Sequence, residues 1–323
     1  MTDVTPVRWG ILGAAKFARE VMGPAIHAAR DAQLCAIASS SEEKIAPFRS
    51  FAPGLRYHDS YEALLADPGI DAVYVPLPNH LHVPWTVKAL QAGKHVLCEK
   101  PIAMRDADFD GLIAARDDSG LLASEAFMIV HHPQWARVAA LLEAGEIGEL
   151  LQVEAVFTYD NPDMGNIRNK PETGGGGLRD IGVYTFGATR LAVAREPLSM
   201  PHARLELRHG VDTFASNVFD FGGFELHSMV STRMERRQQM QFHGTQGSIR
   251  VSCPYNPLTF SQAELHISRA GQPDTIERFP RVDQYIRQVE TFGAAVRGEC
   301  AWPWPLERAR GTQRMIDQAL AGQ

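Results

Sequence analysis

A lysine, an aspartate and a tyrosine in this sequence are placed where their side chains can act on a bound ligand. Lys100 directly follows the predicted strand 95–99 and precedes Pro101, which ends that strand, so an ammonium group lies at a strand end. Asp180 and Tyr184 are four residues apart, which puts them on one face of a predicted helix and lets them address the same ligand. The alternatives are a surface charge for Lys100, a helix N-cap for Asp180 and a buried aromatic ring for Tyr184.

A glycine-containing turn joins the first predicted strand, residues 7–13, to a predicted helix over residues 16–29. Small side chains and free backbone N–H groups at a helix start favour the pyrophosphate of a dinucleotide. Compared with the pattern GxGxxG, this segment keeps only the first glycine and has alanine at the other two positions. A tight turn without a ligand is the alternative. The predicted cofactor contacts are Gly13, Ala14, Ala15, Lys16 and Phe17.

The end of the second predicted strand, residues 34–39, indicates which dinucleotide binds. NAD-binding domains carry a carboxylate here for the ribose hydroxyls, whereas this chain has Ser39 and Ser40. Their hydroxyls, with Lys44 a turn later, can accept a 2′-phosphate, so we predict NADP in preference to NAD. The alternative is that the serines only cap the following helix.

The predicted strand over residues 71–77 leads into a segment at the carboxyl edge of the sheet, where ligands bind in open α/β folds. We therefore expect Pro78 and Asn79 beside the nicotinamide. No third metal ligand accompanies His80 and His82, so we expect a solvated or helix-capping role for both and predict no metal site. The predicted cofactor contacts from this edge are Leu77, Pro78, Asn79, His82, Glu99, Lys100 and Pro101.

The order of the predicted elements indicates two domains. Residues 1–127 alternate short apolar strands with amphipathic helices, which is typical of a Rossmann domain with a parallel sheet. Residues 128–323 predict an α+β domain with an open, mostly antiparallel sheet, including a hairpin at the Gly-Gly turn 221–224. We expect the last two helices, near residues 284–297 and 306–320, to cover that sheet or return to the first domain. The fold class is therefore α/β.

The composition limits the classes of partner. Of 323 residues, 45% are hydrophobic and 22% charged, which is typical of a globular protein. The net charge of -6 and the lack of a basic cluster argue against nucleic acid. The four cysteines form no CxxC pair, and no apolar segment is long enough for a secretory signal or a membrane span. We expect a soluble, cytoplasmic protein with a small-molecule ligand and no membrane partner.

The segments 10–15, 78–82, 99–101 and 177–184, in this order and spacing, together resemble the Gfo/Idh/MocA oxidoreductase family over nearly the whole chain. The sequence looks similar to the D-xylose 1-dehydrogenase and dimeric dihydrodiol dehydrogenase branch, because Tyr184 stands where many relatives have histidine. The resemblance implies that Lys100 and Tyr184 are the catalytic pair and that Asp180 positions or polarises the substrate hydroxyl. It also implies that the loop residues Asn166, Ile167, Arg168 and Asn169 approach the sugar. Arg168 is then a substrate contact.

The resemblance implies NADP-dependent hydride transfer between nicotinamide and a hydroxyl-bearing carbon of a cyclic sugar or related diol. A tyrosine with a pKa of about 10 needs a cation such as Lys100 nearby to favour its phenolate. One alternative is a sugar–sugar oxidoreductase or glycosidase that keeps NAD(P) bound and recycles it. Another is a non-catalytic NAD(P)-binding regulator, although such relatives typically lose the lysine or the acid–base residue. We also expect a homodimer or homotetramer that pairs through the second sheet.

Overall fold

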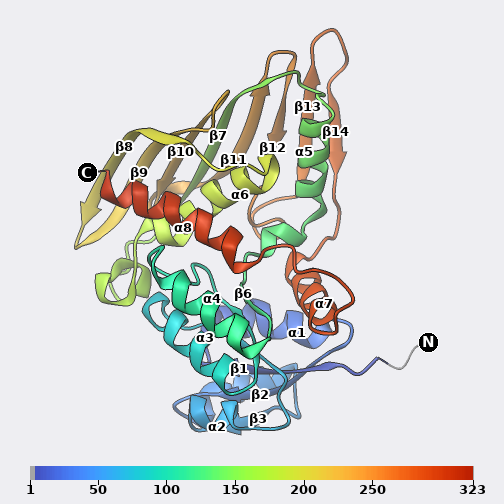
Figure 1. The fold of residues 1–323 in the computed structure, drawn as a ribbon, viewed down its shortest axis with the longest axis vertical. Coiled ribbons are helices and arrows are strands. Elements are labelled where there is room, and N and C mark those ends of the chain that lie inside the picture. Colours follow the sequence, from blue (N-terminus) through green and yellow to red (C-terminus); the bar gives the residue numbers. More distant parts are fainter. Residues whose placement is uncertain (1–3, 323) are drawn as a thin grey trace. The chain divides into compact units, whose positions relative to one another are not determined.

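The computed structural model describes residues 4–322, which form two units (Figure 1). The first unit contains the residues up to 131 together with residues 284–309. The second contains residues 132–283 and those from 310 onward. Each unit is built around one large sheet. Within residues 4–322, no helix has the length and apolar character that crossing a bilayer requires.

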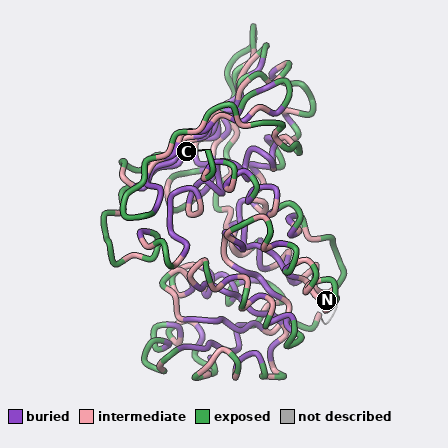
Figure 2. The backbone as a smooth tube through the Cα atoms, turned by 60° about the vertical axis from the view of Figure 1, so that its left-hand side comes forward, coloured by how far each residue is buried: buried purple, intermediate pink, exposed green. Residues whose placement is uncertain are grey.

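The first sheet has six parallel strands in the order β3-β2-β1-β4-β5-β6, which is the Rossmann order. This confirms the predicted parallel sheet. All four residues of β4 are buried, as expected for a parallel strand that has helices on both faces. Figure 2 shows buried segments running through the interior of each unit, with exposed residues mostly at its margins. The strands are β1 (Val7–Leu12), β2 (Ala32–Ala38), β3 (Arg56–His58), β4 (Ala72–Val75), β5 (His95–Cys98) and β6 (Ala123–Glu125).

The helices of this unit follow the predicted spacing, with one difference in the first of them. The predicted helix 16–29 is a π-helix over Ala18–Met22 followed by α1 (Gly23–Ala28). Pro24 lacks a backbone N–H and cannot donate to the preceding turn, and the N–H of Gly23 donates to the carbonyl of Ala18 across a wider turn. The α-helices that follow are α2 (Tyr61–Leu65), α3 (His82–Gln91), α4 (Asp108–Ser119) and α7 (Gln284–Val296), and a 3-10 helix covers Glu42–Ser50.

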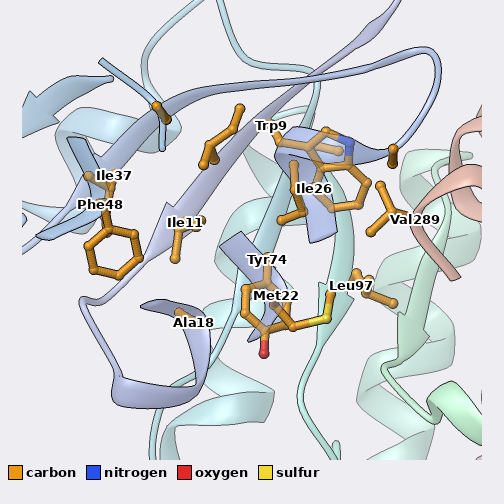
Figure 3. Close-up of a cluster of buried hydrophobic side chains, with 14 of the residues drawn as sticks. Trp9, Ile11, Ala18, Met22, Ile26, Ile37, Phe48, Tyr74, Leu97 and Val289 are labelled. Carbon is orange, nitrogen blue, oxygen red and sulfur yellow. The ribbon is translucent and has the colours of Figure 1, made fainter. Parts of the chain in front are cut away.

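The core of the first unit includes side chains from the end of the chain. Trp9 of β1 lies beside Val289 of α7 (Figure 3). The rings of Trp9 and Phe292 are 5.0 Å apart between centroids. The helix α7 therefore packs on the Rossmann sheet, which was one of the two positions expected for it.

The second sheet has eight strands in the order β14-β13-β12-β11-β7-β10-β9-β8. Only β10 and β7 pair in parallel, and the others are antiparallel, as predicted. The hairpin at 221–224 joins β9 to β10. The strands are β7 (Leu150–Asp160), β8 (Ser199–Arg208), β9 (Val211–Asp220), β10 (Glu225–Ser231), β11 (Arg233–Gly244), β12 (Gly247–Val251), β13 (Glu264–Arg269) and β14 (Thr275–Arg278).

Helices of the second unit lie against this sheet. The helix α6 (Val183–Val193) contacts β7 and β10 and packs beside α5 (Pro133–Glu143) (Figure 1). Nine of the eleven residues of α6 are buried, so its apolar surface is not restricted to one face. The last helix, α8, runs over Leu306–Ala321.

A partly buried histidine makes the stability of the first unit sensitive to acid. His131 packs its ring 5.0 Å from that of Trp302, and among the described residues its Nε2 atom has no hydrogen-bond partner. Burial lowers the pKa of His131 to about 3, from an unfolded value of about 6.5. The unfolded chain therefore binds a proton below pH 6.5 that the folded protein excludes, and stability is lost as the pH falls from about 6.5 towards 3.

We expect His131→Phe to reduce this acid sensitivity, because a phenyl ring retains the packing on Trp302 and does not titrate. The free energy of unfolding of the unaltered protein should lose about 2 kcal/mol through His131 between pH 7.5 and pH 5. Urea unfolding at both pH values measures the difference. An equal loss in the variant and the unaltered protein would contradict the assignment.

Candidate active site

The turn after β1 has the backbone that close approach of a ligand requires. Gly13 is buried, has φ of +106°, and donates its N–H to the carbonyl of Ala38 at 2.9 Å. A Cβ atom at Gly13 would lie 3.0 Å from the Leu77 side chain. A larger residue here would therefore be strained by the backbone conformation and crowded by Leu77. Ala14 and Ala15 follow with partly exposed, small side chains.

The other two residues predicted in this turn differ in exposure. Lys16 is exposed and lies 3.9 Å from Glu20, one helical turn later. The ring of Phe17 packs edge-on against Tyr285 of α7, with 5.7 Å between centroids. Tyr285 is thus a neighbour of the turn that the sequence did not reveal, because it lies more than two hundred residues away.

The serines after β2 have distinct environments. Ser39 is buried, and its carbonyl accepts a hydrogen bond from the Tyr57 hydroxyl at 3.2 Å. Ser40 is exposed, and its hydroxyl accepts a hydrogen bond from the Lys44 ammonium at 2.8 Å. Neither serine side chain caps the 3-10 helix over Glu42–Ser50, whose N-cap residue is Ser41. An exposed hydroxyl and an ammonium group thus lie together where a 2′-phosphate would be expected.

His82 differs from the solvated or capping role expected for it. The residue is 1% exposed, with Nδ1 2.7 Å from the carbonyl oxygen of Pro101 and Nε2 2.7 Å from that of Leu77. Burial lowers the pKa of His82 to about 4, and the contacts with the two carbonyl groups oppose that shift. The ring therefore links the segment after β4 to the segment after β5. His80, in contrast, is exposed.

Glu99, which precedes Lys100, is hydrogen-bonded by a tyrosine of the neighbouring strand. The hydroxyl of Tyr74, in β4, donates to Oε1 of Glu99 at 2.7 Å, and Glu99 Oε2 accepts from the backbone N–H of Lys100 at 3.3 Å. Burial and the charge of Glu99 raise the pKa of Tyr74. The peptide bond between Lys100 and Pro101 is cis. Lys100 is partly exposed at the carboxyl edge of the first sheet, as predicted from the sequence.

Glu125, at the end of β6, is a second acidic residue near this edge. It is 3% exposed and accepts hydrogen bonds from the Ile102 backbone N–H at 3.1 Å and from the Trp304 indole at 3.3 Å. Burial raises the pKa of Glu125, while the Ile102 N–H and the positive charge of Lys100 lower it. Neither Glu125 nor Tyr74 was predicted from the sequence as a site residue. The signal that could have identified them was a polar side chain inside, or at the end of, a buried strand, because such a side chain needs a hydrogen-bond partner.

In the second unit, Asp180 and Tyr184 lie within consecutive helical turns. The segment begins as a π-helix over Leu178–Gly182, which continues as α6 and has Gly177 as its N-cap. Asp180 is therefore inside the helix and is not the N-cap. Tyr184 is 6% exposed and packs against the rings of Phe157 and Tyr255, each 5.6 Å away between centroids.

The glycine run before this helix is held in a defined conformation by close contacts. Residues 174–177 are buried, and Gly176 has φ of +118°. A Cβ atom there would lie 2.1 Å from Oδ1 of Asp212, and Oδ2 of Asp212 accepts the N–H of Leu178 at 2.6 Å. The glycines thus allow Asp212 to approach the backbone and hold the start of the helix.

The carboxylate of Asp180 is held by two other side chains. Oδ1 accepts from Nε of Arg168 at 2.9 Å, and Oδ2 accepts from the Tyr159 hydroxyl at 2.5 Å. Burial and the charge of Asp180 raise the pKa of Tyr159, so its phenol stays protonated. The charge of Asp180 also raises the pKa of Arg168. Arg168, predicted as a substrate contact, is thus an ion-pair partner of Asp180, with 44% of its side-chain surface exposed.

The loop that carries Arg168 is anchored by the residue that follows the arginine. Asn169 is 2% exposed and donates to the carbonyl oxygens of Asn161 and Asp163 at 2.9 and 2.7 Å. Its own side-chain oxygen accepts from Arg233 at 2.9 Å. Asn169 therefore maintains the loop, whereas Ile167 is 42% exposed and Asn166 caps the short turn that follows it.

The structure therefore groups the predicted site residues within each unit. In the first, Gly13, the serines after β2 and the segments around Pro78 and Lys100 all follow strands of one parallel sheet. In the second, Arg168, Asp180 and Tyr184 are grouped with Tyr159, which was not predicted from the sequence. Among the described residues, no group of three or more histidine, cysteine, aspartate or glutamate side chains is placed to hold a metal ion.

Comparison with known families gives a match for each unit. Residues 7–127 match the GFO_IDH_MocA model, described as an oxidoreductase family with an NAD-binding Rossmann fold. Residues 135–250 match the model of the GFO/IDH/MocA C-terminal domain. Together these matches span most of the chain.

Individual relatives are similar along almost the full length. A dTDP-3,4-didehydro-2,6-dideoxy-alpha-D-glucose 3-reductase from Actinomadura kijaniata is 33% identical, over 99% of this chain and 96% of its own. A D-xylose 1-dehydrogenase (NADP(+)) from Haloferax volcanii is 34% identical, over 89% and 88%. The crystal structure of a 3-ketoreductase from A. kijaniata with NADP and TDP-benzene superposes with a TM-score of 0.91 at 31% identity, covering 98% of both chains. Variants of that ketoreductase have also been solved, with a lysine replaced by alanine or glutamate and a tyrosine by phenylalanine.

Proposed function

Because the chain belongs to the Gfo/Idh/MocA oxidoreductase family, we propose that it catalyses NADP-dependent hydride transfer between nicotinamide and a hydroxyl-bearing carbon of a sugar or related diol. The observation that carries this proposal is the retention of Lys100, Asp180 and Tyr184 in structured positions. The lysine and tyrosine replaced in the A. kijaniata ketoreductase are as far apart along that chain as Lys100 and Tyr184 are here. A purely regulatory protein would have no need for this set.

The fit of the dinucleotide rests on the turn after β1 and the end of β2. Gly13 leaves space that a Cβ atom would fill, and backbone N–H groups at a helix start favour the pyrophosphate. The pair formed by Ser40 and Lys44 supports a 2′-phosphate and hence NADP, the cofactor named for two of the relatives above. We further propose that Leu77, Pro78, Asn79 and the segment 99–101 border the nicotinamide.

The proposed chemistry assigns one task to each side chain. When bound, the nicotinamide accepts or donates the hydride. Tyr184 removes the hydroxyl proton during oxidation and returns it during reduction. Lys100 contributes a positive charge that stabilises negative charge on oxygen. Asp180 orients the substrate hydroxyl, and we propose Arg168 as a further contact with the sugar.

The relatives indicate two kinds of sugar, so the test must include both. A panel of free aldoses, polyols, dihydrodiols and nucleotide-linked keto sugars should be assayed with NADP(H) and NAD(H) by the absorbance of reduced nicotinamide. We expect turnover of at least one sugar and a preference for NADP(H). No exchange of hydride with any compound of the panel would refute the proposal.

The same assay addresses a recycling mechanism, in which the cofactor stays bound and two sugars exchange hydride. A solved aldose–aldose oxidoreductase from Caulobacter crescentus shares this fold, with a TM-score of 0.88 at 22% identity. Purified protein that retains nicotinamide after desalting, and converts sugar pairs without added cofactor, would favour this mechanism. Dependence on added NADP(H) would favour the dehydrogenase or reductase.

We also propose that the chain forms a homo-oligomer through the outer face of the second sheet. Val156, Val218 and Met229 lie on that face, opposite the buried side chains of their strands, and each remains partly exposed in a single chain. A broad sheet face with apolar side chains favours pairing. Sedimentation should therefore show a dimer or tetramer, and a monomer at micromolar concentration would refute this proposal.

A further inference from the structure

Tyr159 lies in a part of the chain that the proposed mechanism does not use. It is near the end of β7, two residues after Phe157, so both side chains point to the same face of the sheet. Phe157 contacts the ring of Tyr184, with 5.6 Å between centroids, and the Tyr159 hydroxyl bonds to Asp180. One face of β7 therefore contacts both Asp180 and Tyr184.

The hydrogen bonds of the Asp180 carboxylate connect three elements. Tyr159 comes from β7, Arg168 from the loop after it, and Asp180 from the π-helix. Each carboxylate oxygen already has one donor, so the group cannot rotate without losing a hydrogen bond. The Asp180 side chain is 13% exposed, and hydrogen bonds to a charged group in such a setting are stronger than neutral ones.

We propose that Tyr159 is a positioning residue that acts on the reaction through Asp180, with Arg168 holding the opposite oxygen. This inference rests on the proposed function, since it explains how Asp180 presents a fixed acceptor to the substrate hydroxyl. It also separates the tasks of the two tyrosines. Tyr159 remains a protonated donor to Asp180, and Tyr184 is left as the residue that exchanges a proton.

A double-mutant cycle tests whether Tyr159 acts through Asp180. Tyr159→Phe keeps the ring and removes only the donor. We expect it to lower kcat/KM for the sugar by about ten-fold or more, with KM for NADPH unchanged. In an Asp180→Asn background the same replacement should change kcat/KM by less than about two-fold. The carboxylate that accepts the Tyr159 hydroxyl has already been altered there. Equal losses in both backgrounds, or no loss in either, would overturn the proposal.

A control variant separates this effect from the general loss of a buried hydroxyl. Thr189→Val removes a buried hydroxyl that donates to the carbonyl of Thr185 at 2.9 Å, in the same unit. Its kcat/KM should equal that of the unaltered protein. If Thr189→Val is as damaging as Tyr159→Phe, the loss reflects packing and the proposal fails.

A second measurement does not depend on turnover. Because Arg168 is tied to Asp180, Asp180→Asn should speed tryptic cleavage after Arg168 several-fold, and Tyr159→Phe should do so to a smaller extent. Glu277→Gln, which releases Arg137 from an ion pair of 2.7 Å in the same unit, should leave that cleavage unchanged. Unchanged cleavage in both site variants would overturn the proposal.

The kinetic measurement and the cleavage measurement together distinguish a failure of this inference from a failure of the function on which it rests. If the unaltered protein converts no sugar, the proposed function fails, and cleavage after Arg168 alone decides whether Tyr159 and Arg168 hold Asp180. If the protein converts sugar but the losses are additive, the function stands and the inference fails.

Discussion

Lys100→Ala should lower sugar turnover by about two to four orders of magnitude while leaving NADPH affinity close to that of the unaltered protein. The side chain lies at the carboxyl edge of the first sheet, next to Glu99, which Tyr74 holds from β4. Truncation at Lys100 leaves that contact and the Gly13 turn intact, so fold and pyrophosphate binding should persist. Single-turnover kinetics and a fluorescence titration with NADPH measure the two effects separately.

The matched control for this change is Lys88→Ala, which removes the same charge from the same unit. Lys88 is 50% exposed on α3, 3.2 Å from Glu62 and 4.1 Å from the ring centroid of Trp85. Its loss should leave turnover within about two-fold of normal, since exposed ion pairs contribute little. Turnover that survives in Lys100→Ala, or falls equally in both variants, would remove Lys100 from the mechanism.

Tyr184→Phe should lower kcat by about two to three orders of magnitude in both reaction directions, because the hydroxyl is the proposed proton donor and acceptor. The ring packs against Phe157 and Tyr255, and phenylalanine preserves both contacts. The unfolding midpoint should therefore change little, which separates a chemical effect from a structural one. Steady-state assays of oxidation and reduction, with thermal unfolding of the same samples, provide the measurement.

Tyr255→Phe is the control for this second change. It removes a hydroxyl from the same aromatic cluster, where Tyr255 stacks on Phe157 at 4.9 Å between centroids. We expect a much smaller loss of kcat than for Tyr184→Phe. Comparable losses would mean that the cluster responds to any missing hydroxyl, and Tyr184 would no longer be the proposed acid–base residue.

Much of the first unit could be predicted because its signals are local. The alternation of apolar strands and amphipathic helices predicted the parallel sheet, and the turn at Gly13 was found from its place between a strand and a helix. The short strand β3 and the strands β13 and β14 were not predicted. β3 and β14 contain no buried residue, so their apolar pattern is weak, whereas β13 buries Leu265 and Ile267 in alternation and that signal was missed.

The contacts around the site were harder to predict than its elements. His82 was expected to be solvated or to cap a helix, because its sequence neighbours do not show that two carbonyl groups, after β4 and β5, enclose it. Glu125 and Tyr74 are polar residues in otherwise buried strands, and only their partners reveal why they are there. Tyr159 resembles any other aromatic residue of a strand until Asp180 is placed beside it.

The Rossmann order of elements, the glycine turn and the residue types available at strand and helix ends could be predicted without a structure. These follow from backbone geometry and side-chain periodicity over a few residues. The folded chain was needed to show that α7 packs on β1 through Phe292 and Trp9, and that Tyr159 and Arg168 both bind Asp180. An amphipathic pattern shows which face is buried but not what covers it, and a carboxylate has many possible donors until packing selects two of them.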